Sequence, residues 1–312
     1  MKPWRITIDT NPDECNLKCT MCDTHSPFST KKKIRKSMDS TLLENILDEV
    51  LKLQVKEIIP TTMGEALLYK HFSIFIDKIK GTSTKLNLTT NGTFLKKWQD
   101  RLLPILSDIK ISINSINKVV NEKIMIGDQT EQKIQDIKNF IALRNEKFPN
   151  VSITLQVTFL KSNLDELENI IKFGIENGVN RIKGHHLWIN FDEIKNESLL
   201  RDPKLWNQFI HRIEKYRKDI NLVNFEKITS SNGSIPEEYI CPFLGNELWI
   251  DFNGDYNICC APSDKRVVLG SWGNFQTHSI ENLFNSENYT KLINSYKEQD
   301  ICRTCPLRKK KD

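Results

Sequence analysis

The sequence predicts an α/β protein with a partial (β/α)6 TIM-like barrel, followed by a small C-terminal domain made of a β-hairpin and a helix. Three observations support this prediction. Short β-rich runs alternate with amphipathic helical patterns over roughly the first 190 residues. Polar turn residues follow several of these runs directly, and the eight cysteines lie in two groups near the two ends of the chain. Alternation of strands and helices is typical of parallel sheets covered by helices.

Six β-rich runs are the expected strands of the barrel. They cover residues 4–10, 56–60, 86–89, 109–113, 151–159 and 181–188. Successive strand–helix units predict parallel strands joined by right-handed crossovers. Because the chemistry of a barrel lies at the carboxyl ends of its strands, we expect functional residues in the turns that follow these runs.

Helical patterns separate the runs. Asp39 or Ser40 can cap a helix whose apolar residues between positions 42 and 51 repeat every 3.6 residues. Residues 129–145 show the same periodicity. Asn163 and Glu166 predict a capping box for a helix over residues 164–176.

The alternation stops near residue 190, which predicts three parts: a barrel over 1–190, a bridge over 191–236 and a C-terminal domain over 237–312. The bridge is polar, with one amphipathic helix near residues 205–216. Asn253-Gly254 stands between two β-rich runs and predicts a hairpin with a two-residue type I′ turn. A last helix, near residues 280–296, leads into Cys302, Cys305 and Pro306.

The composition is that of an ordinary soluble protein, with 38% hydrophobic and 27% charged residues. No apolar run is long enough to cross a membrane, and the N-terminus lacks the apolar stretch of a signal peptide. The net charge of +5 is mild, and the run 308–311 is expected to be a solvated, frayed tail rather than a nucleic-acid patch. We therefore expect a cytoplasmic protein with neither membrane nor nucleic acid as a partner, whose cysteines serve metal or redox chemistry.

Cys15, Cys19 and Cys22 are spaced C-x3-C-x2-C directly after the first expected strand. Zinc sites are usually closed by four ligands. Three cysteines without a local fourth ligand suit a cubane iron–sulfur cluster with one open iron. A zinc knuckle and three reduced core cysteines are the alternatives.

Turn and polar residues stand at the ends of the next three expected strands. They are Met63-Gly64-Glu65, then Asn91 after the third strand, and Ser112 and Asn114 at the fourth. Together with the cysteine spacing, these motifs resemble the radical S-adenosylmethionine (SAM) enzymes over roughly residues 4–190.

The resemblance implies a SAM-binding [4Fe-4S] cluster on the three cysteines. It also implies that Gly64 and Glu65 hold the amino group of SAM, that Asn91 belongs to the cofactor site, and that Ser112 and Asn114 approach the ribose. This sequence departs from the family at Met63, where a second glycine is usual, and at Met21, where an aromatic residue is common. It departs again at Met125, where the family often has an arginine near the SAM carboxylate; Lys123 is a candidate substitute.

The C-terminal cysteines resemble a shortened SPASM, or twitch, domain, which carries one auxiliary [4Fe-4S] cluster. On this resemblance the ligands are Cys241, Cys259, Cys302 and Cys305. A four-cysteine zinc site remains the alternative, because spacing does not separate zinc from iron. Cys260 is then left over, although it could exchange with Cys259, since adjacent residues of a strand point to opposite faces. Cys260 is either a small buried hydrophobic residue or the hydrogen-atom donor of an epimerase.

His185 and His186 end the sixth expected strand. Adjacent strand residues face opposite ways, which excludes a metal site that uses both. One of them is a candidate substrate contact or proton acceptor, and packing is the alternative.

The resemblance implies reductive cleavage of SAM to a 5′-deoxyadenosyl radical, which takes a hydrogen atom from a substrate carbon. The expected reaction is oxidation, or epimerisation, of a small sugar or aminocyclitol-type precursor, with electrons from a flavodoxin- or ferredoxin-type donor. A maturase that epimerises a ribosomal peptide or forms thioethers in it is the first alternative. A non-catalytic iron–sulfur or zinc module is the second.

Overall fold

A computed structural model describes residues 1–30, 37–60, 63–229, 235–261, 267–305 and 307–310 of the chain. Three expected features lie outside these residues: the Thr61-Thr62 start of the turn after the second strand, Pro306 after the last cysteine, and Lys311 of the tail. No helix among the described residues is long and apolar enough to span a membrane.

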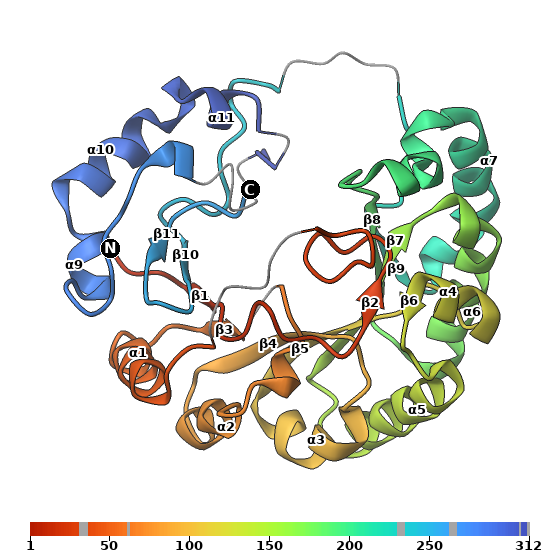
Figure 1. Cartoon of the computed structure of the whole chain (residues 1–312), viewed down its shortest axis with the longest axis horizontal. Coiled ribbons are helices and arrows are strands. Elements are labelled where there is room, and N and C mark those ends of the chain that lie inside the picture. The colour runs from red at the N-terminus through yellow and green to blue at the C-terminus, as the bar shows by residue number, and fades with distance from the viewer. Residues whose placement is uncertain (31–36, 61–62, 230–234, 262–266, 306, 311–312) are drawn as a thin grey trace.

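A curved nine-stranded sheet forms the centre of the molecule, and helices cover its outer face (Figure 1). The strand order is β11-β10-β1-β3-β4-β5-β7-β8-β9, and every neighbouring pair is parallel except β10 and β11. The strands are β1 (Arg5–Ile8), β3 (Glu57–Pro60), β4 (Lys85–Thr90), β5 (Leu106–Ser112), β7 (Ser152–Phe159), β8 (Arg181–His186), β9 (Asn221–Val223), β10 (Glu247–Ile250) and β11 (Tyr256–Asn257). The two remaining strands, β2 (Lys18–Cys19) and β6 (Met125–Ile126), form a separate antiparallel pair. The predicted partial barrel is therefore confirmed.

The helices follow the strands as the alternation predicted. The α-helices are α1 (Ser40–Lys52), α2 (Ser73–Ile79), α3 (Leu95–Leu102), α4 (Lys118–Ile124), α5 (Thr130–Lys147), α6 (Leu167–Asn177), α7 (Pro203–Ile213), α9 (Ile280–Phe284), α10 (Glu287–Ser295) and α11 (Asp300–Arg303). The 3-10 helices are η1 (Ala66–Leu68), η2 (Leu103–Ile105), η3 (Lys161–Glu166), η4 (Asp192–Glu197), η5 (Leu199–Arg201), η6 (Glu214–Lys218), η7 (Val267–Leu269) and η8 (Tyr296–Glu298). Asp39 caps α1 by accepting a hydrogen bond from Thr41 N over 2.8 Å, one of the two caps expected there.

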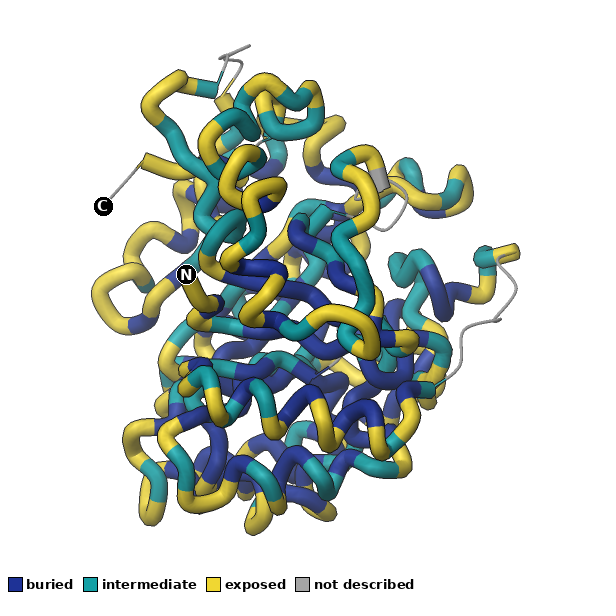
Figure 2. Tube along the Cα trace, turned by 90° about the vertical axis from the view of Figure 1, so that its left-hand side faces the viewer, coloured by how far each residue is buried: buried dark blue, intermediate teal, exposed yellow. Residues whose placement is uncertain are grey.

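The main core lies between the sheet and the helices. Figure 2 shows buried residues where the helices face the strands and exposed residues on the outer turns. Gly184 shows how tight this layer is, because a Cβ on it would lie 1.7 Å from the ring of Phe159. Since side chains alternate along a strand, Lys183 and His185 face the inside of the barrel.

The C-terminal hairpin is continuous with the barrel sheet. β10 pairs in parallel with β1, from Arg5 opposite Glu247 to Ile8 opposite Ile250. The predicted two-residue turn is wrong, because β10 ends at Ile250 and β11 begins only at Tyr256. Type I′ needs positive φ at both central residues, but of Asn253 and Gly254 only the glycine has it, at +94°.

Asp251 explains the longer turn. Its carboxylate accepts hydrogen bonds from the backbone N–H groups of Asn253 and Asp255, each over 2.9 Å. An aspartate that binds the backbone two residues later is a strong turn former, and here it overrides the Asn-Gly preference.

Two expected helix features are also corrected. α6 begins at Leu167 rather than near 164, because Asn163 is buried and joins strand ends instead of capping the helix. Its amide nitrogen donates to the carbonyl oxygens of Asn114 and Thr158, over 2.9 and 3.0 Å. The single helix expected over 280–296 is divided into α9 and α10, because Ser286 starts a new helix by accepting from Tyr289 N.

The expectation of a frayed basic tail is wrong for Arg308. Its side chain is buried, and its guanidinium donates to the carbonyl oxygens of Pro236, Glu237 and Tyr239 over 2.8 to 3.1 Å. A guanidinium has five donors in a fixed fork, which suits it to gathering several carbonyl groups. Arg308 thereby anchors the C-terminal segment.

Candidate functional site

The three N-terminal cysteines lie in a loop that the barrel holds in place. Cys15, Cys19 and Cys22 line one pocket of about 230 Å³ at the carboxyl ends of the barrel strands. Cys19 belongs to β2, which β6 pairs and fixes. Leu17 N lies 3.5 Å from the sulfur of Cys15, and His25 N lies 3.3 Å from that of Cys22. Hydrogen bonds to sulfur stabilise thiolates and influence the potential of a bound cluster.

The loop is a poor environment for free thiolates. Burial raises the pKa of Cys15, and it raises the pKa of Cys19 to about 12, with further increases from the neighbouring thiolates. Metal ligands must be deprotonated, so the binding of iron by these thiols would release their protons. Three thiols around one pocket fit an iron–sulfur cluster with a fourth position open.

Gly64 marks the place where the turn after β3 meets the cysteine loop. A Cβ on Gly64 would lie 2.3 Å from the carbonyl oxygen of Asn11 and 2.4 Å from that of Glu14, so only glycine fits there. The backbone N–H of Glu65 donates to the same Glu14 oxygen over 2.8 Å. The turn is therefore tied to the residue that precedes Cys15.

Glu65 is 1% exposed, and its carboxylate binds the protein on both oxygens. Oε1 accepts from Leu67 N over 3.2 Å and from Thr90 Oγ1 over 2.8 Å, and Oε2 accepts from Asn91 N over 2.7 Å. Burial raises the pKa of Glu65, although these donors oppose the shift. The carboxylate fixes the end of β4 against the turn after β3, and it also lines the pocket.

Asn91 connects the end of β4 to the cysteine loop. Its amide nitrogen donates to Asn16 Oδ1 over 2.8 Å and lies 3.9 Å from the sulfur of Cys15. Its side-chain oxygen accepts from Thr93 N over 3.0 Å. Asn91 is thus placed in the pocket wall, where its contacts orient the first cysteine.

Ser112 and Asn114, at the end of β5, line the same pocket. Asn114 Oδ1 accepts from Thr158 N over 2.9 Å, which holds the ends of β5 and β7 together. Gln156 and Thr158 of β7 also line it, although neither was among the expected site residues. The alternation of side chains along residues 151–159 was the signal that could have identified them.

Lys123 does not belong to this group. It is exposed on α4 and is absent from the described residues that line the pocket. The buried cation of this region is Lys133 of α5, whose ammonium lies 2.5 Å from the Asp128 carboxylate, with the two side chains 1% and 0% exposed. Lys133 Nζ also lies 3.7 Å from the sulfur of Met125, a pocket residue.

A chain of buried polar contacts extends from this ion pair to β5. Asn121 donates to Asp128 Oδ2 over 2.5 Å, and its side-chain oxygen accepts from the backbone N–H groups of Asn114 and Ser115 over 3.0 and 3.2 Å. Lys133, Asp128 and Asn121 thus form one buried polar network. A lysine on the apolar side of a helical pattern, in phase with Ile137 and Phe140, was the overlooked signal.

The five C-terminal cysteines meet in a second pocket of about 60 Å³. Cys241, Cys259, Cys260, Cys302 and Cys305 all line it. Burial, followed by the charges of Cys259, Cys241 and Cys305, raises the pKa of Cys302 to about 11. Among the described residues, no three His, Cys, Asp or Glu side chains are grouped closely enough to hold a single metal ion.

Cys259 and Cys260 both reach this second pocket, whereas alternation predicted that only one would do so readily. The reason is that β11 ends at Asn257, so these cysteines are outside the strand to which alternation applies. The thiol of Cys260 is hydrogen-bonded to that of Cys259.

The two histidines at the end of β8 have different surroundings. The His186 ring packs against Phe159 and Trp206, with ring centroids 5.2 and 5.0 Å apart. The side chain of His185 meets solvent on the inner face of the strand, although the protein around it displaces part of its hydration. Desolvation, followed by the charge of Lys183, lowers the pKa of His185 to about 4. The imidazole of His185 is therefore neutral at pH 7 and able to accept a proton or a hydrogen bond.

Two family models match the chain. The model of the radical SAM superfamily matches residues 12–174, and that of an iron–sulfur cluster-binding domain, SPASM, matches residues 241–306. The tungsten-containing aldehyde ferredoxin oxidoreductase cofactor-modifying protein of Pyrococcus furiosus is 23% identical over 94% of this chain and 85% of its own length. A probable GTP 3′,8-cyclase of Sulfurisphaera tokodaii is 25% identical over 54% of this chain and 51% of its own.

Solved structures share the fold at low sequence identity. Streptococcus suis SuiB bound to S-adenosylmethionine superposes with a TM-score of 0.69 at 17% identity, covering 97% of this chain and 72% of that one. BtrN in complex with AdoMet and 2-DOIA gives 0.54 at 15% identity, covering 98% and 94%.

Proposed function

Because this chain belongs to the radical SAM superfamily, we propose that it cleaves S-adenosylmethionine reductively and abstracts a hydrogen atom from a small substrate, which it then oxidises. The cofactors expected from the sequence, SAM and two iron–sulfur clusters, agree with both family matches and with SAM-bound proteins of the same fold. The chain is an enzyme of this superfamily; the oxidation and the small substrate are the parts that we propose.

The observation that carries the proposal is the composition of the first pocket. Three thiols and the polar ends of three neighbouring strands line one cavity of about 230 Å³. In this proposal Cys15, Cys19 and Cys22 each hold one iron of a [4Fe-4S] cluster. When bound, the reduced cluster and SAM supply a 5′-deoxyadenosyl radical.

The remaining pocket residues orient the bound SAM. The proposal places the SAM amino group at the Gly64-Glu65 turn, where Glu65 Oε2 has Asn91 N as its donor at 2.7 Å and keeps a lone pair for an ammonium. Ser112 and Asn114 offer polar groups to the ribose from the end of β5. Met125 stands where the family often has an arginine near the SAM carboxylate. Lys133, whose Nζ lies next to the sulfur of Met125, supplies a buried positive charge there.

In the C-terminal pocket, Cys241, Cys259, Cys302 and Cys305 are the proposed ligands of the auxiliary cluster. Oxidation needs an acceptor for the electron left on the substrate radical, and a cluster beside the barrel can take it. The radical also loses a proton, and His185, neutral and on the inner face of β8, is the proposed acceptor. Electrons for SAM cleavage come, in this proposal, from a flavodoxin- or ferredoxin-type protein in the cytoplasm.

A second candidate is the modification of a larger molecule, either a peptide or an organic cofactor. A relative that matches 94% of this chain is named as cofactor-modifying, and SuiB has been solved with its precursor peptide SuiA. Both reactions would use the same SAM site.

The test is anaerobic reconstitution with iron and sulfide, followed by SAM, dithionite and mass spectrometry for 5′-deoxyadenosine. We expect about eight irons per chain, from two four-iron clusters. Cys19→Ala should abolish 5′-deoxyadenosine formation and keep about four irons. Cys302→Ala, which removes a proposed ligand of the second cluster instead, is the matched control. Undiminished SAM cleavage by the Cys19→Ala protein would contradict the proposal, and about four irons with one zinc would make the second site structural.

A further inference from the structure

The inner face of β8 presents charged side chains beside the first pocket. Lys183 and His185 share this face with Arg181, because side chains alternate along the strand. In the register of β7 and β8, Lys183 is opposite Gln156 and His185 is opposite Thr158. Gln156 and Thr158 both line the pocket of the N-terminal cysteines, and neighbouring strands are about 4.8 Å apart. Lys183 therefore stands one strand away from the wall of that pocket.

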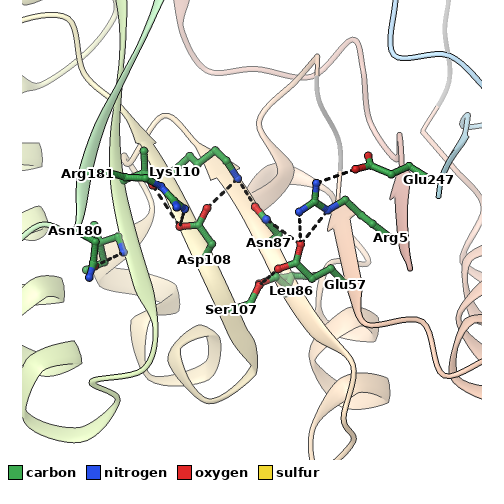
Figure 3. A network of polar contacts seen from close by, with 12 residues as sticks. Arg5, Glu57, Leu86, Asn87, Ser107, Asp108, Lys110, Asn180, Arg181 and Glu247 are labelled. Carbon is green, nitrogen blue, oxygen red and sulfur yellow. Dashed lines mark hydrogen bonds and ion pairs between the residues drawn. The ribbon is translucent and has the colours of Figure 1, made fainter. Parts of the chain in front are cut away.

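Next to β8 the described cations outnumber the carboxylates, because Glu57 and Glu247, further along the sheet in Figure 3, are paired with Arg5. Figure 3 shows Arg181 and Lys110 pointing at the same Asp108 carboxylate, over 2.7 and 3.0 Å. Lys183 is half-buried and, within the described part of the chain, has no ion pair. One carboxylate thus serves two cations, and the charge of Lys183 is left without a counterion.

The C-terminal segment adds another cation, Lys309, whose charge acts on Lys183. Lys309 is held by paired backbone hydrogen bonds with Ile240, over 2.7 and 2.9 Å, next to the buried anchor Arg308. Burial, followed by repulsion from Lys110, Arg181 and Lys309, lowers the pKa of Lys183, and Asp108 only partly compensates. Gathering cations in a partly desolvated site costs free energy, which a bound anion would recover.

We propose that Lys183, assisted by Lys309 and by the imidazole N–H of His185, binds an anionic oxygen group, a phosphate or a carboxylate, of the substrate. The inference rests on the proposed function, because the substrate of that reaction would lie between this group and the SAM pocket. Hydrogen bonds between a cation and an oxyanion are roughly twice as strong as neutral ones. An unmodified aminocyclitol, which is a cation, would be repelled here. Acidic or phosphorylated sugars, and larger phosphorylated molecules, fit the site.

The test measures binding of inorganic phosphate to the anaerobically reconstituted holoenzyme with SAM bound, by equilibrium dialysis at low ionic strength. Lys183→Met should weaken phosphate binding by about tenfold or more, and Lys183→Arg should restore most of it. Lys147→Met, at an exposed position of α5, removes the same charge elsewhere and should leave binding unchanged. Lys309→Met, on the exposed tail, should weaken binding by a smaller factor. It provides a second test if Lys183→Met fails to fold.

Competition with acetate separates the two sources of the anion. Displacement of phosphate by acetate at similar concentration assigns a carboxylate site, and failure to displace assigns a phosphate site. Equal phosphate affinity in the wild type, Lys183→Met and Lys309→Met proteins, or no binding at all, would overturn the inference. SAM cleavage is measured on the same samples. Cleavage without lysine-dependent anion binding refutes the anion site alone, whereas anion binding without cleavage refutes the proposed function and leaves the anion site standing.

Discussion

Replacing Lys133 with methionine should destabilise the protein by about 3–5 kcal/mol, because it leaves a buried carboxylate without its cation. The ammonium and the Asp128 carboxylate are 2.5 Å apart, and neither side chain has more than 1% of its surface exposed. Asp128 would keep its hydrogen bonds from Asn121 and Thr130, but neither donor carries a charge. Methionine is close to lysine in length, so the change removes the charge and little of the packing.

This free energy can be converted into a melting temperature. Unfolding entropy near 60 °C is about 2.1 cal/mol/K per residue, which gives about 0.65 kcal/mol/K for 312 residues. A loss of about 3–5 kcal/mol then lowers the midpoint by about 5–8 °C. The exposed Lys147→Met control, on the same helix, should shift it by less than about 2 °C.

Calorimetry of three variants tests the reasoning. Asp128→Asn should lower the midpoint by a similar amount, because it leaves the ammonium unpaired instead. The double variant Lys133→Met/Asp128→Asn removes both charges and should be clearly more stable than the sum of the single losses implies. A Lys133→Met midpoint within about 2 °C of wild type, or strictly additive losses in the double variant, would refute the account of the ion pair.

Three further predictions concern the site and the sheet. Gly64→Ala should reduce SAM affinity at least tenfold, measured by equilibrium dialysis, because its Cβ would lie 2.3 Å from Asn11 O; an unchanged affinity means that this turn does not shape the SAM site. Burial by itself would raise the pKa of Glu57, but hydrogen bonds from Ser107, Arg5 and Asn87 together outweigh it and lower the pKa. The contribution of the Glu57 carboxylate to the free energy of unfolding is therefore present near pH 7 and is lost as pH falls through the folded pKa. The loss of unfolding free energy in Glu57→Gln should therefore be measurable at pH 7 and shrink below about pH 4, and a loss independent of pH contradicts this sign. Cys260→Ser should retain turnover if the reaction is an oxidation; solvent deuterium fixed at a substrate carbon by the wild type, and lost in this variant, would make the enzyme an epimerase.

The strands of the barrel could be predicted because each depends on a local pattern. The run at 151–159 is β-rich by itself, and β7 covers Ser152–Phe159. The strand ends of the pocket followed from the same reasoning, since parallel strands bring Glu65, Asn91 and Asn114 to one edge. The local sequence was sufficient to predict an element wherever its side-chain pattern and its backbone preference indicated the same secondary structure.

Features that depend on distant partners could not be predicted in this way. The burial of Lys133 depends on Asp128 and on the loop that covers both, and the burial of Arg308 depends on carbonyl groups some seventy residues earlier. The turn after β10 was decided by the Asp251 carboxylate rather than by Asn-Gly propensity. Tertiary contacts of a few kcal/mol outweigh propensities that differ by about 1 kcal/mol.

The pairing of β1 with β10 has a consequence for the order in which the chain can fold during synthesis. β1 leaves the ribosome long before the strand that covers its outer edge, which begins only at Glu247. Until then β1 offers a row of unpaired backbone groups, the kind of edge on which chains aggregate. Domains usually fold as they emerge, but here β1 waits for a strand that is synthesised 242 residues later, counted from Arg5 to Glu247. A shortened chain that stops before Glu247 should therefore associate through the β1 edge, and the nascent chain should depend on chaperones until the hairpin docks.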